Sequence, residues 1–341
     1  MTSLPNVTAT PYSPGAGLPV FLEPTDDLLR HDPTAVASWF TQHRAAIDAM
    51  TTEVGALVLR GFAISQTSDF AALIDTYASP GFGYAGGATP RGNIEGKVFE
   101  ATSAPPAFRI PLHQEMAYLP QYPQRLAFYC PLPAETGGET ILGNMRAFDA
   151  KLDPAFRARV KERGVLNQRN FRSPHWQTGH DILDARHRPW TEAFNTTDPK
   201  KAEADCAAMG LTYEWVEDSL TTRYCGPGIV IHPTTGEEIW FNQMLQQATI
   251  VENIGPELMA AYEEYYNDGR PWPYEVYYGD GSPIDLADMS AAYPLLDEVT
   301  VAFPWHRNDV MFVDNFATSH GRNPFTGPRD VQVALLEQAA A

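Results

Sequence analysis

Cysteine and basic side chains are scarce in this sequence. The 341 residues include three cysteines, Cys130, Cys206 and Cys225, and none of them forms a C-x-x-C pair. That number and spacing argue against a disulfide framework and a cysteine-based zinc site, so we expect free thiols in a reducing compartment. Lys and Arg number 24 against 42 Asp and Glu, for a net charge of −18. This balance argues against binding to nucleic acid or an anionic membrane, because both require basic surface.

Long apolar runs and phosphate-binding glycine patterns are also missing. No apolar stretch approaches the length of a membrane-spanning helix. The first 20 residues, MTSLPNVTATPYSPGAGLPV, lack the basic start and apolar centre of a signal peptide. We therefore predict a cytoplasmic protein with a flexible lead-in over residues 1–20. The glycine-rich stretch 79–96 follows neither the P-loop nor the dinucleotide-binding spacing.

The rest of the chain alternates short apolar runs with a few helical patterns. Helical spacing of apolar residues predicts helices over 32–53, 67–78, 145–164 with a break at Pro154, and 255–268. Strand patterns occur at 55–62, 109–116, 125–132 and 138–144, and HPTTGEE at 232–238 is typical of a hairpin turn. We see no interdomain linker. The pattern predicts a single mainly β domain over residues 21–341, a barrel or sandwich framed by helices.

The segment IPLHQEMAYLP, residues 110–120, places His113 and Glu115 two positions apart. On an extended strand these side chains would share one face, with Gln114 on the other. A buried carboxylate needs a partner or a metal ion, because removing a charge from water is costly. A single His-x-Glu pair is weak evidence, since surface or structural roles explain most such pairs.

A second histidine strengthens the metal interpretation. His320 follows the strand pattern DVMFVDN near the C-terminus. Two histidines and one carboxylate form the facial triad of non-haem Fe(II) oxygenases, which leaves coordination positions open for a 2-oxo acid and O2. A cosubstrate such as 2-oxoglutarate also needs a cation for its distal carboxylate. We expect Arg329, nine residues after His320, to supply it from the strand beside the metal, with Thr140 sharing the carboxylate.

Four segments carry a family resemblance: IPLHQEM, FYCPLPAETGGET, HPTTGEEIWFNQ and VDNFATSHGRNPFTGPR. From about residue 50 onward, the chain resembles the TauD/TfdA family of Fe(II)/2-oxoglutarate dioxygenases, most closely its SyrP-like branch. The resemblance implies a double-stranded β-helix (jelly-roll) core and the cofactors Fe(II), 2-oxoglutarate and O2. It also implies metal ligation by His113, Glu115 and His320, and cosubstrate binding by Arg329 and Thr140. Related halogenases lack the carboxylate ligand, so Glu115 favours an oxygenase.

The resemblance implies a reaction class and leaves the substrate open. We expect hydroxylation of an unactivated C–H bond in an amino acid or related specialised-metabolite intermediate, with release of succinate and CO2. The small-molecule substrate could be free or an aminoacyl group on a carrier protein. Desaturation, epoxidation and cyclisation remain alternatives, as do a zinc hydrolase and a non-catalytic jelly-roll binding module. The oligomeric state is open.

Several further residues are candidates for the substrate pocket, each with a structural alternative. Asn242 could instead brace the barrel, and Arg91 could be a solvated loop charge. Arg322 is a second candidate for the cosubstrate cation, although we expect it to pair with Asp314. Residues 145–245 are expected to form an insertion and lid between the two halves of the metal site. The complete set of substrate candidates is Asn242, Tyr118, Met116, Arg91 and Arg322.

Overall fold

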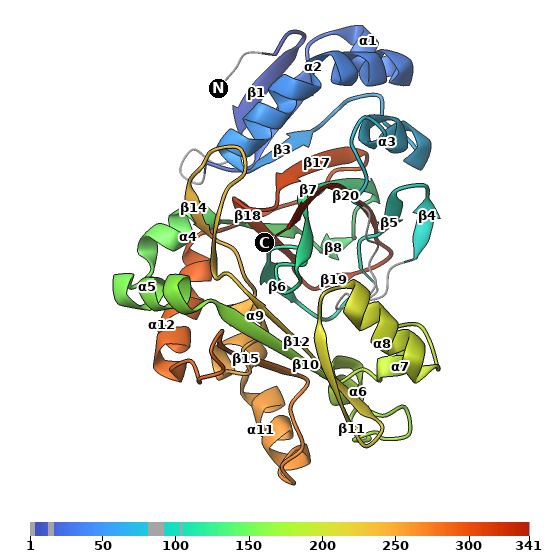
Figure 1. The fold of residues 1–341 in the computed structure, drawn as a ribbon. Helices are drawn as coiled ribbons and strands as arrows, with labels where there is room; N and C mark the ends of the chain where they lie inside the picture. The colour runs from blue at the N-terminus through green and yellow to red at the C-terminus, as the bar shows by residue number, and fades with distance from the viewer. Residues whose placement is uncertain (1–3, 13–16, 81–91, 103, 341) are drawn as a thin grey trace.

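A computed structural model describes residues 4–12, 17–80, 92–102 and 104–340. Two sheets form its centre (Figure 1). The larger has eight strands in the order β1 (Val7–Pro11), β2 (Val20–Pro24), β3 (Ala56–Leu59), β17 (Asp309–Asp314), β7 (Gln121–Leu132), β20 (Asp330–Ala340), β5 (Val98–Glu100) and β4 (Asn93–Glu95). The smaller has the order β16 (Thr300–Phe303), β9 (Thr140–Asn144), β18 (Thr318–Arg322) and β6 (Ile110–His113). A short ladder joins β19 (Phe325–Thr326) to β8 (Thr136–Gly137).

Alternation along the central strands divides the interior into two layers. In β7, Leu126 and Phe128 pack into the cluster that also holds Leu142 of the smaller sheet. Ala127 and Tyr129 point to the opposite face and pack with the N-terminal helices. Because side chains alternate across a strand, one apolar run can serve both layers when both faces are covered. The predicted mainly β fold with framing helices is confirmed.

Three helices cover the outer face of the larger sheet: α1 (Asp27–His31), α2 (Pro33–Val54) and α3 (Thr67–Ile74). The Asp32 side chain caps α2 by accepting hydrogen bonds from the backbone N–H groups of Thr34 and Ala35. Gly55 ends α2 with a φ of 91°, and a Cβ there would lie 2.3 Å from Thr318 Oγ1. The predicted helix over 32–53 is confirmed, and the one over 67–78 ends four residues early.

The chain leaves the central sheets after β9 and returns at β16. This insertion holds α4 (Met145–Lys151), α5 (Pro154–Arg163) and a sheet of β11 (Thr212–Val216), β12 (Ser219–Gly226), β10 (Val165–Phe171) and β15 (Tyr274–Tyr278). It also holds the hairpin of β13 (Ile229–Ile231) and β14 (Glu238–Trp240). The remaining helices are α6 (Asp181–Arg186), α7 (Trp190–Ala193), α8 (Pro199–Ala208), α9 (Met244–Gln247), α10 (Val251–Ile254), α11 (Pro256–Tyr265) and α12 (Leu286–Glu298).

The insertion extends from the central sheets on the side opposite α1 and α2 (Figure 1). The predicted helix break at Pro154 is confirmed, since Asp153 caps α5 at the Phe156 N–H. The predicted hairpin at 232–238 is confirmed by β13 and β14. The insertion sheet takes its last strand from 274–278, beyond the expected boundary at residue 245, because β15 pairs with β10.

The expected flexible lead-in is wrong for its described part. Residues Val7–Pro11 form β1 and pair antiparallel with β2. Leu4 is buried, and the indole N–H of Trp39 donates to the Pro5 carbonyl at 3.0 Å. Edge pairing satisfies backbone groups that a flexible segment would leave to water. Pro and Thr in this segment therefore belong to an edge strand.

The described residues also bear on membrane-spanning helices and disulfide bonds. Within the described ranges, no helix is long and apolar enough to cross a membrane. All three cysteines are free, with Cys130 and Cys206 buried and Cys225 exposed. A disulfide framework is therefore absent from the described chain, as the cysteine count predicts.

Candidate metal centre

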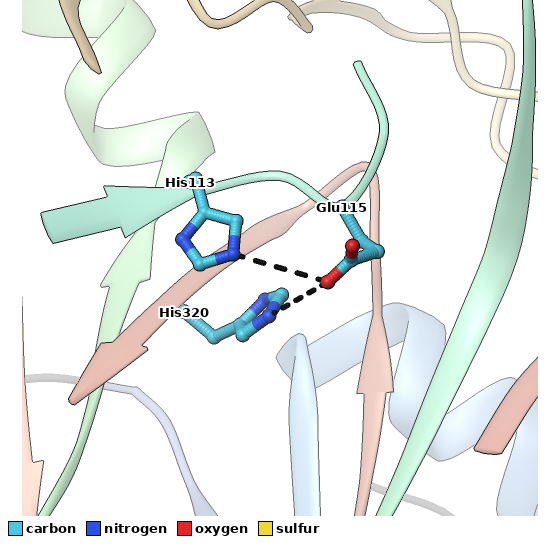
Figure 2. A group of neighbouring side chains, drawn as sticks. All are labelled: His113, Glu115 and His320. Atoms are coloured by element: carbon cyan, nitrogen blue, oxygen red, sulfur yellow. Dashed lines mark ion pairs between the residues drawn. The ribbon is translucent and has the colours of Figure 1, made fainter. Parts of the chain in front are cut away.

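His113 and His320 lie directly opposite each other on β6 and β18, where the strand register pairs them (Figure 2). Their ring centroids are 4.4 Å apart. Gly321 follows His320, and a Cβ on that residue would lie 2.4 Å from the Ile110 carbonyl oxygen. Glycine is required here because any side chain would push β18 away from β6.

Glu115 reaches the same point from a turn. β6 ends at His113, and Met116 has a φ of 59°, so the extended strand assumed from the sequence is wrong beyond His113. Asn315 holds this turn: its Oδ1 accepts from the Glu115 N–H at 2.7 Å, and its Nδ2 donates to the Glu115 carbonyl at 3.0 Å. Gln114 points away, donating to the carbonyls of Trp240 and Phe316. The expected grouping of side chains is nevertheless present.

The three side chains offer donor atoms that lie within 4.8 Å of one another. The Oε2 of Glu115 is 3.8 Å from His113 Nε2 and 3.5 Å from His320 Nε2 (Figure 2). These distances exceed those of hydrogen bonds, which favour about 2.7–3.2 Å. His113 Nδ1 lies 2.9 Å from the Pro111 carbonyl and donates to it, so in the neutral ring Nε2 carries the lone pair.

A cation fits this arrangement. A lone pair facing a carboxylate oxygen at this distance is unfavourable unless positive charge lies between them. Two imidazoles and one carboxylate are the donor set that non-haem Fe(II) prefers. The Nδ1 of His320 is buried and has no hydrogen-bond partner in the described part of the chain, so no protein acceptor fixes its tautomer. The residues present therefore fit an iron ion held by His113, Glu115 and His320.

A cavity of about 310 Å³ opens over the three side chains. Four of the residues singled out in the sequence line it: Thr140, Arg322, Arg329 and Tyr118. Met116 does not line the cavity, because the turn directs it into the core with 2% of its surface exposed.

Asn242, another substrate candidate, does not contribute to this wall. Asn242 donates to the Gly228 carbonyl at 2.8 Å and accepts from the Met244 N–H at 2.9 Å. Asn242 does not line the cavity, and its hydrogen bonds fit the structural alternative, in which it braces the barrel. Arg91 lies outside the described residues.

Arg329 brings a buried positive charge into the cavity. Its Nε is buried without a hydrogen-bond partner, and no ion pair joins it to a carboxylate among the described residues. Burial, together with the charge of Arg322, lowers the pKa of the Arg329 guanidinium to about 10. The group is thus charged at neutral pH, and a buried unpaired cation is unfavourable. An anionic ligand would relieve this penalty.

The position of Arg329 differs from the expected one. It immediately precedes β20, which pairs with β7 and β5 in the larger sheet. His320 lies on β18, whose neighbours are β9 and β6 in the smaller sheet. The expectation that Arg329 lies on the strand beside the metal is therefore wrong. The nine-residue connection crosses between sheets, so Arg329 reaches the cavity from the opposite sheet.

Thr140 begins β9, next to β18. Its Oγ1 accepts a hydrogen bond from the Trp305 indole N–H at 2.8 Å. A hydroxyl has one proton, and the tryptophan donor occupies one of its acceptor positions. The Thr140 hydroxyl proton thus remains for donation to a ligand in the cavity. Sequence reasoning missed Trp305, which lies 165 positions away.

Arg322 already donates to the protein backbone through both terminal nitrogens, although its Nε is buried without a partner in the described residues. Burial lowers the pKa of its guanidinium. The expected ion pair with Asp314 is wrong, because Asp314 accepts from two backbone N–H groups of its own turn and from the Thr52 hydroxyl of α2. The guanidinium of Arg322 instead donates, at 3.2, 2.7 and 2.7 Å, to the carbonyls of Ala104, Pro105 and Phe108.

A second buried histidine–carboxylate pair lies outside the cavity. His232 Nε2 is 3.1 Å from Asp314 Oδ2. The Nδ1 of His232 accepts from the backbone N–H groups of Thr234 and Thr235. With Nδ1 accepting, Nε2 carries the proton and donates to the carboxylate. His232 is therefore a structural histidine, as its place before a hairpin turn predicts.

The insertion supplies cavity residues that sequence reasoning missed. Apart from Ala185, their side chains are polar but bear no metal-ligand or motif signature. The only sequence signal is the glutamine-rich run NQMLQQ after the WF pair at 240–241. The main members of this set are Ala185, Arg186, Gln243, Gln246, Gln247 and Tyr274.

Comparisons with known proteins agree with this geometry. The model of the family described as "Taurine catabolism dioxygenase TauD, TfdA family" matches residues 22–335. A clavaminate synthase-like protein of Arabidopsis thaliana is 32% identical over 297 residues, covering 85% of this chain and 84% of its own. The dapdiamide synthesis protein DdaC of Enterobacter agglomerans is 29% identical over 315 residues, covering 89% and 88%.

Solved structures share the fold. PvcB, described as an Fe, alpha-ketoglutarate dependent oxygenase from an isonitrile synthetic pathway, aligns with a TM-score of 0.56 and 17% identity over 99% of this chain and 94% of its own. A taurine dioxygenase of Burkholderia xenovorans aligns with a TM-score of 0.53 and 17% identity over 99% and 95%. The two central sheets are thus a jelly-roll core. The chain belongs to the TauD/TfdA family and is a dioxygenase whose cofactors are Fe(II), 2-oxoglutarate and O2.

Proposed function

We propose that the protein hydroxylates an unactivated C–H bond of an amino acid or a related specialised-metabolite intermediate. One observation carries the cosubstrate assignment: the half-buried guanidinium of Arg329, whose buried Nε has no partner in the described residues, shares a cavity with the His113, Glu115 and His320 donor set. 2-Oxoglutarate has a chelating 2-oxo acid at one end and a carboxylate at the other. A guanidinium binds such a carboxylate through two parallel hydrogen bonds, and Thr140 adds a third donor.

The protein's own residues hold and orient the reactants. Bound iron supplies the activation of O2 that makes C–H oxidation possible. His113 Nδ1–H donates a hydrogen bond to the Pro111 carbonyl, so the lone pair of the neutral ring is on Nε2. Asn315 fixes the backbone of Glu115. Phe128, whose ring lies 5.3 Å from that of His320, provides an apolar wall on the cavity. Overall, one oxygen atom of O2 enters succinate, the other enters the alcohol, and 2-oxoglutarate loses CO2.

Two alternatives from other classes are less well supported. Zinc accepts two histidines and a carboxylate, and a hydrolase would use water in the remaining position. Neither a zinc hydrolase nor a binding module requires a buried cation opposite the metal, and family membership favours the oxygenase. Desaturation, epoxidation and cyclisation use the same ligands and cofactors. Product mass distinguishes desaturation from hydroxylation.

The form of the substrate is also a proposal. The names of DdaC and PvcB place those proteins in dapdiamide synthesis and an isonitrile pathway, which supports a specialised-metabolite substrate, free or carried by a partner protein. The insertion lines the cavity through Arg186 and Gln243, so we propose that residues 145–245 act as a lid. The cytoplasmic location predicted from the sequence remains a prediction.

The proposed function can be tested in two steps. Anaerobic addition of Fe(II) and then 2-oxoglutarate to the metal-free protein should give a weak visible charge-transfer band. Admission of O2 with candidate substrates should yield succinate and a product heavier by one oxygen atom, measured by mass spectrometry. A wild-type protein that shows neither band nor succinate would contradict the proposal. A product lighter by two hydrogens would assign desaturation instead.

A further inference from the structure

The cavity has the opposite charge character from the chain. The chain carries a net charge of −18, yet four arginines line the cavity, and Glu115 is the single carboxylate among the described lining residues. The lining arginines differ in what they already bind. Arg109 pairs with Asp297 at 3.2 Å. Arg322 donates to backbone carbonyls, and Arg329 is the proposed partner of 2-oxoglutarate.

Arg186 remains as a cation for a second anion. It is the last residue of α6 and is half-buried in the cavity wall. Its Nε donates to the Tyr262 hydroxyl at 3.4 Å, and no ion pair joins it to a carboxylate among the described residues. A guanidinium in this setting favours a carboxylate or a phosphate, because its planar fork matches both.

Two glutamines, Gln243 and Gln247, carry a fixed hydrogen-bond direction into the same cavity. Gln243 Nε2 is 2.6 Å from the Gln114 carbonyl, so this atom must be the donor nitrogen. The Oε1 of Gln243 then faces Gln247 at 3.4 Å, and only the nitrogen of Gln247 can face it favourably. The reversed amide would place two acceptors against each other. Because the Gln247 nitrogen donates to Gln243, the Gln247 side chain offers its Oε1 as the atom that is left for a ligand.

The Oε1 of Gln247 is a buried acceptor that lacks a donor. Gln247 is 8% exposed, lines the cavity, and its Oε1 has no hydrogen-bond partner in the described residues. An unsatisfied buried acceptor is unfavourable, and a ligand N–H would satisfy it. The neighbouring Gln246 Oε1 is also buried without a partner.

We infer that the substrate carries an ammonium or other N–H group beside an anion, and that Gln247 and Arg186 determine its specificity. The inference rests on the proposed function and narrows it to the chemistry of a free amino acid. Gln247 Oε1 accepts from the nitrogen, and Arg186 binds the carboxylate. An aminoacyl thioester has no free carboxylate, although a phosphopantetheine arm would offer a phosphate to the same guanidinium. The test must therefore separate these two sources of negative charge.

The experiment measures binding to the anaerobic protein loaded with Fe(II) and 2-oxoglutarate. Each proteinogenic L-amino acid is titrated, and the change in the visible band reports binding. For the tightest binder, three matched probes follow: the deamino acid, the methyl ester and the phosphopantetheine thioester. The same probes are titrated into Gln247→Leu and Arg186→Met. Arg159→Met removes a charge from the insertion outside the cavity lining and serves as the control, since Arg159 pairs with Asp288.

Coupling between the variant and the probe is the decisive result. Removing the amino group should weaken wild-type binding about tenfold to a hundredfold, the range expected for a hydrogen bond to a charged group. Gln247→Leu should lose a similar factor for the amino acid and nothing more for the deamino acid. Arg186→Met should show the same pattern with the methyl ester. The band and the 2-oxoglutarate affinity should match wild type in all three variants.

Each other result contradicts the inference in a recognisable way. If the variant and probe effects simply add, Gln247 and Arg186 do not contact these groups. If the band forms and no amino acid binds, the inference fails while the proposed cosubstrate chemistry stands. If the thioester binds tighter than the free amino acid and Arg186→Met abolishes that advantage, the anion is phosphate and the free-amino-acid assignment is wrong. If no band forms, the proposed function fails and the inference fails with it.

Discussion

Two histidine–carboxylate clusters lie in the interior of this molecule, and only one of them faces the cavity. In the first, His232 and Asp314 approach to 3.1 Å, and protein donors and acceptors complete both side chains. In the second, the Glu115 carboxylate lies 3.5–3.8 Å from two imidazole nitrogens, too far for good hydrogen bonds. The first cluster is complete without a ligand. The second gathers two imidazoles and one carboxylate whose donor atoms could hold a cation between them.

The same contrast separates the two cavity arginines. Arg322 donates to backbone carbonyls, and its role is to hold the segment 104–108 against β18. The Nε atoms of both arginines are buried without a partner, but no hydrogen bond joins the terminal nitrogens of Arg329 to the described residues. Residue type is the same in each pair, so it does not identify function. What distinguishes the functional member is the hydrogen bonding or charge that the protein leaves incomplete.

The largest predicted effect comes from removing a metal donor. His113→Ala, Glu115→Ala or His320→Ala should each nearly abolish iron-dependent turnover, because each removes one of three protein ligands. The fold should persist, since backbone contacts through Asn315 and the β6–β18 pairing do not use these side chains. Iron content by elemental analysis and succinate formation check the effect. A variant that keeps both near wild-type levels would show that its residue is not a ligand.

The structural cluster should respond in the opposite way. His232→Ala leaves Asp314 without one donor and two backbone N–H groups without their acceptor. We expect a loss of about 3 kcal/mol in the free energy of unfolding, the range for breaking a buried pair. Iron binding per folded molecule should be unchanged. Urea unfolding with and without Fe(II) measures both quantities, and lost iron affinity without lost stability would break the comparison.

The two arginines extend the test to the cosubstrate. Arg329→Ala should weaken 2-oxoglutarate binding by at least about tenfold to a hundredfold, from the 1.5–3 kcal/mol of a charge-assisted bond. Iron binding should persist because the triad is untouched. Lysine should rescue only part of the loss, since it lacks the guanidinium fork. Titration of 2-oxoglutarate against the visible band of the Fe(II)-loaded protein provides the measurement.

Stability gives this prediction a matched control. Arg322→Ala removes the donors of the carbonyls in 104–108, so it should lower the free energy of unfolding. Arg329→Ala removes an unpaired buried charge and should not lower it in the absence of 2-oxoglutarate. The reverse pattern, with Arg322→Ala losing 2-oxoglutarate affinity and Arg329→Ala losing only stability, would show that the cosubstrate assignment belongs to Arg322.

Much of the site could be predicted from short segments of sequence. His113, Glu115 and His320 stand in motifs with recognisable donor chemistry, and the helices and hairpin follow from local patterns. The sequence could not show that Glu115 leaves the strand, because Asn315, 200 positions away, holds that turn. Nor could it show that β20 pairs in the opposite sheet. Such features depend on contacts between distant segments.

The cavity-lining glutamines Gln243 and Gln247 show the same limit of sequence-based prediction. Gln247 gains its significance from Gln243, whose direction is set by the Gln114 carbonyl, 129 positions earlier. A glutamine is usually a surface residue, so its type alone predicts little. Which glutamine is buried with an unmet acceptor is a property of tertiary packing. The wrong prediction of a flexible segment at the N-terminus has the same origin, since β1 forms by pairing with β2.

The smallest predicted effect concerns Thr140, whose hydroxyl group both accepts a hydrogen bond within the protein and has a proton to donate to a ligand. Its oxygen accepts from Trp305 at 2.8 Å, and its proton remains for the cosubstrate carboxylate. Thr140→Val keeps the shape and removes the hydroxyl, so 2-oxoglutarate affinity should fall about fivefold to tenfold, near 1 kcal/mol. Thr140→Ser should keep most of the affinity. Trp305→Phe removes the neighbouring donor and leaves the hydroxyl, so it should weaken binding less than Thr140→Val. If Thr140→Val and Trp305→Phe weaken 2-oxoglutarate binding equally, the Thr140 hydroxyl acts through its hydrogen bond to Trp305. Thr140 would then have a structural role, as His232 does.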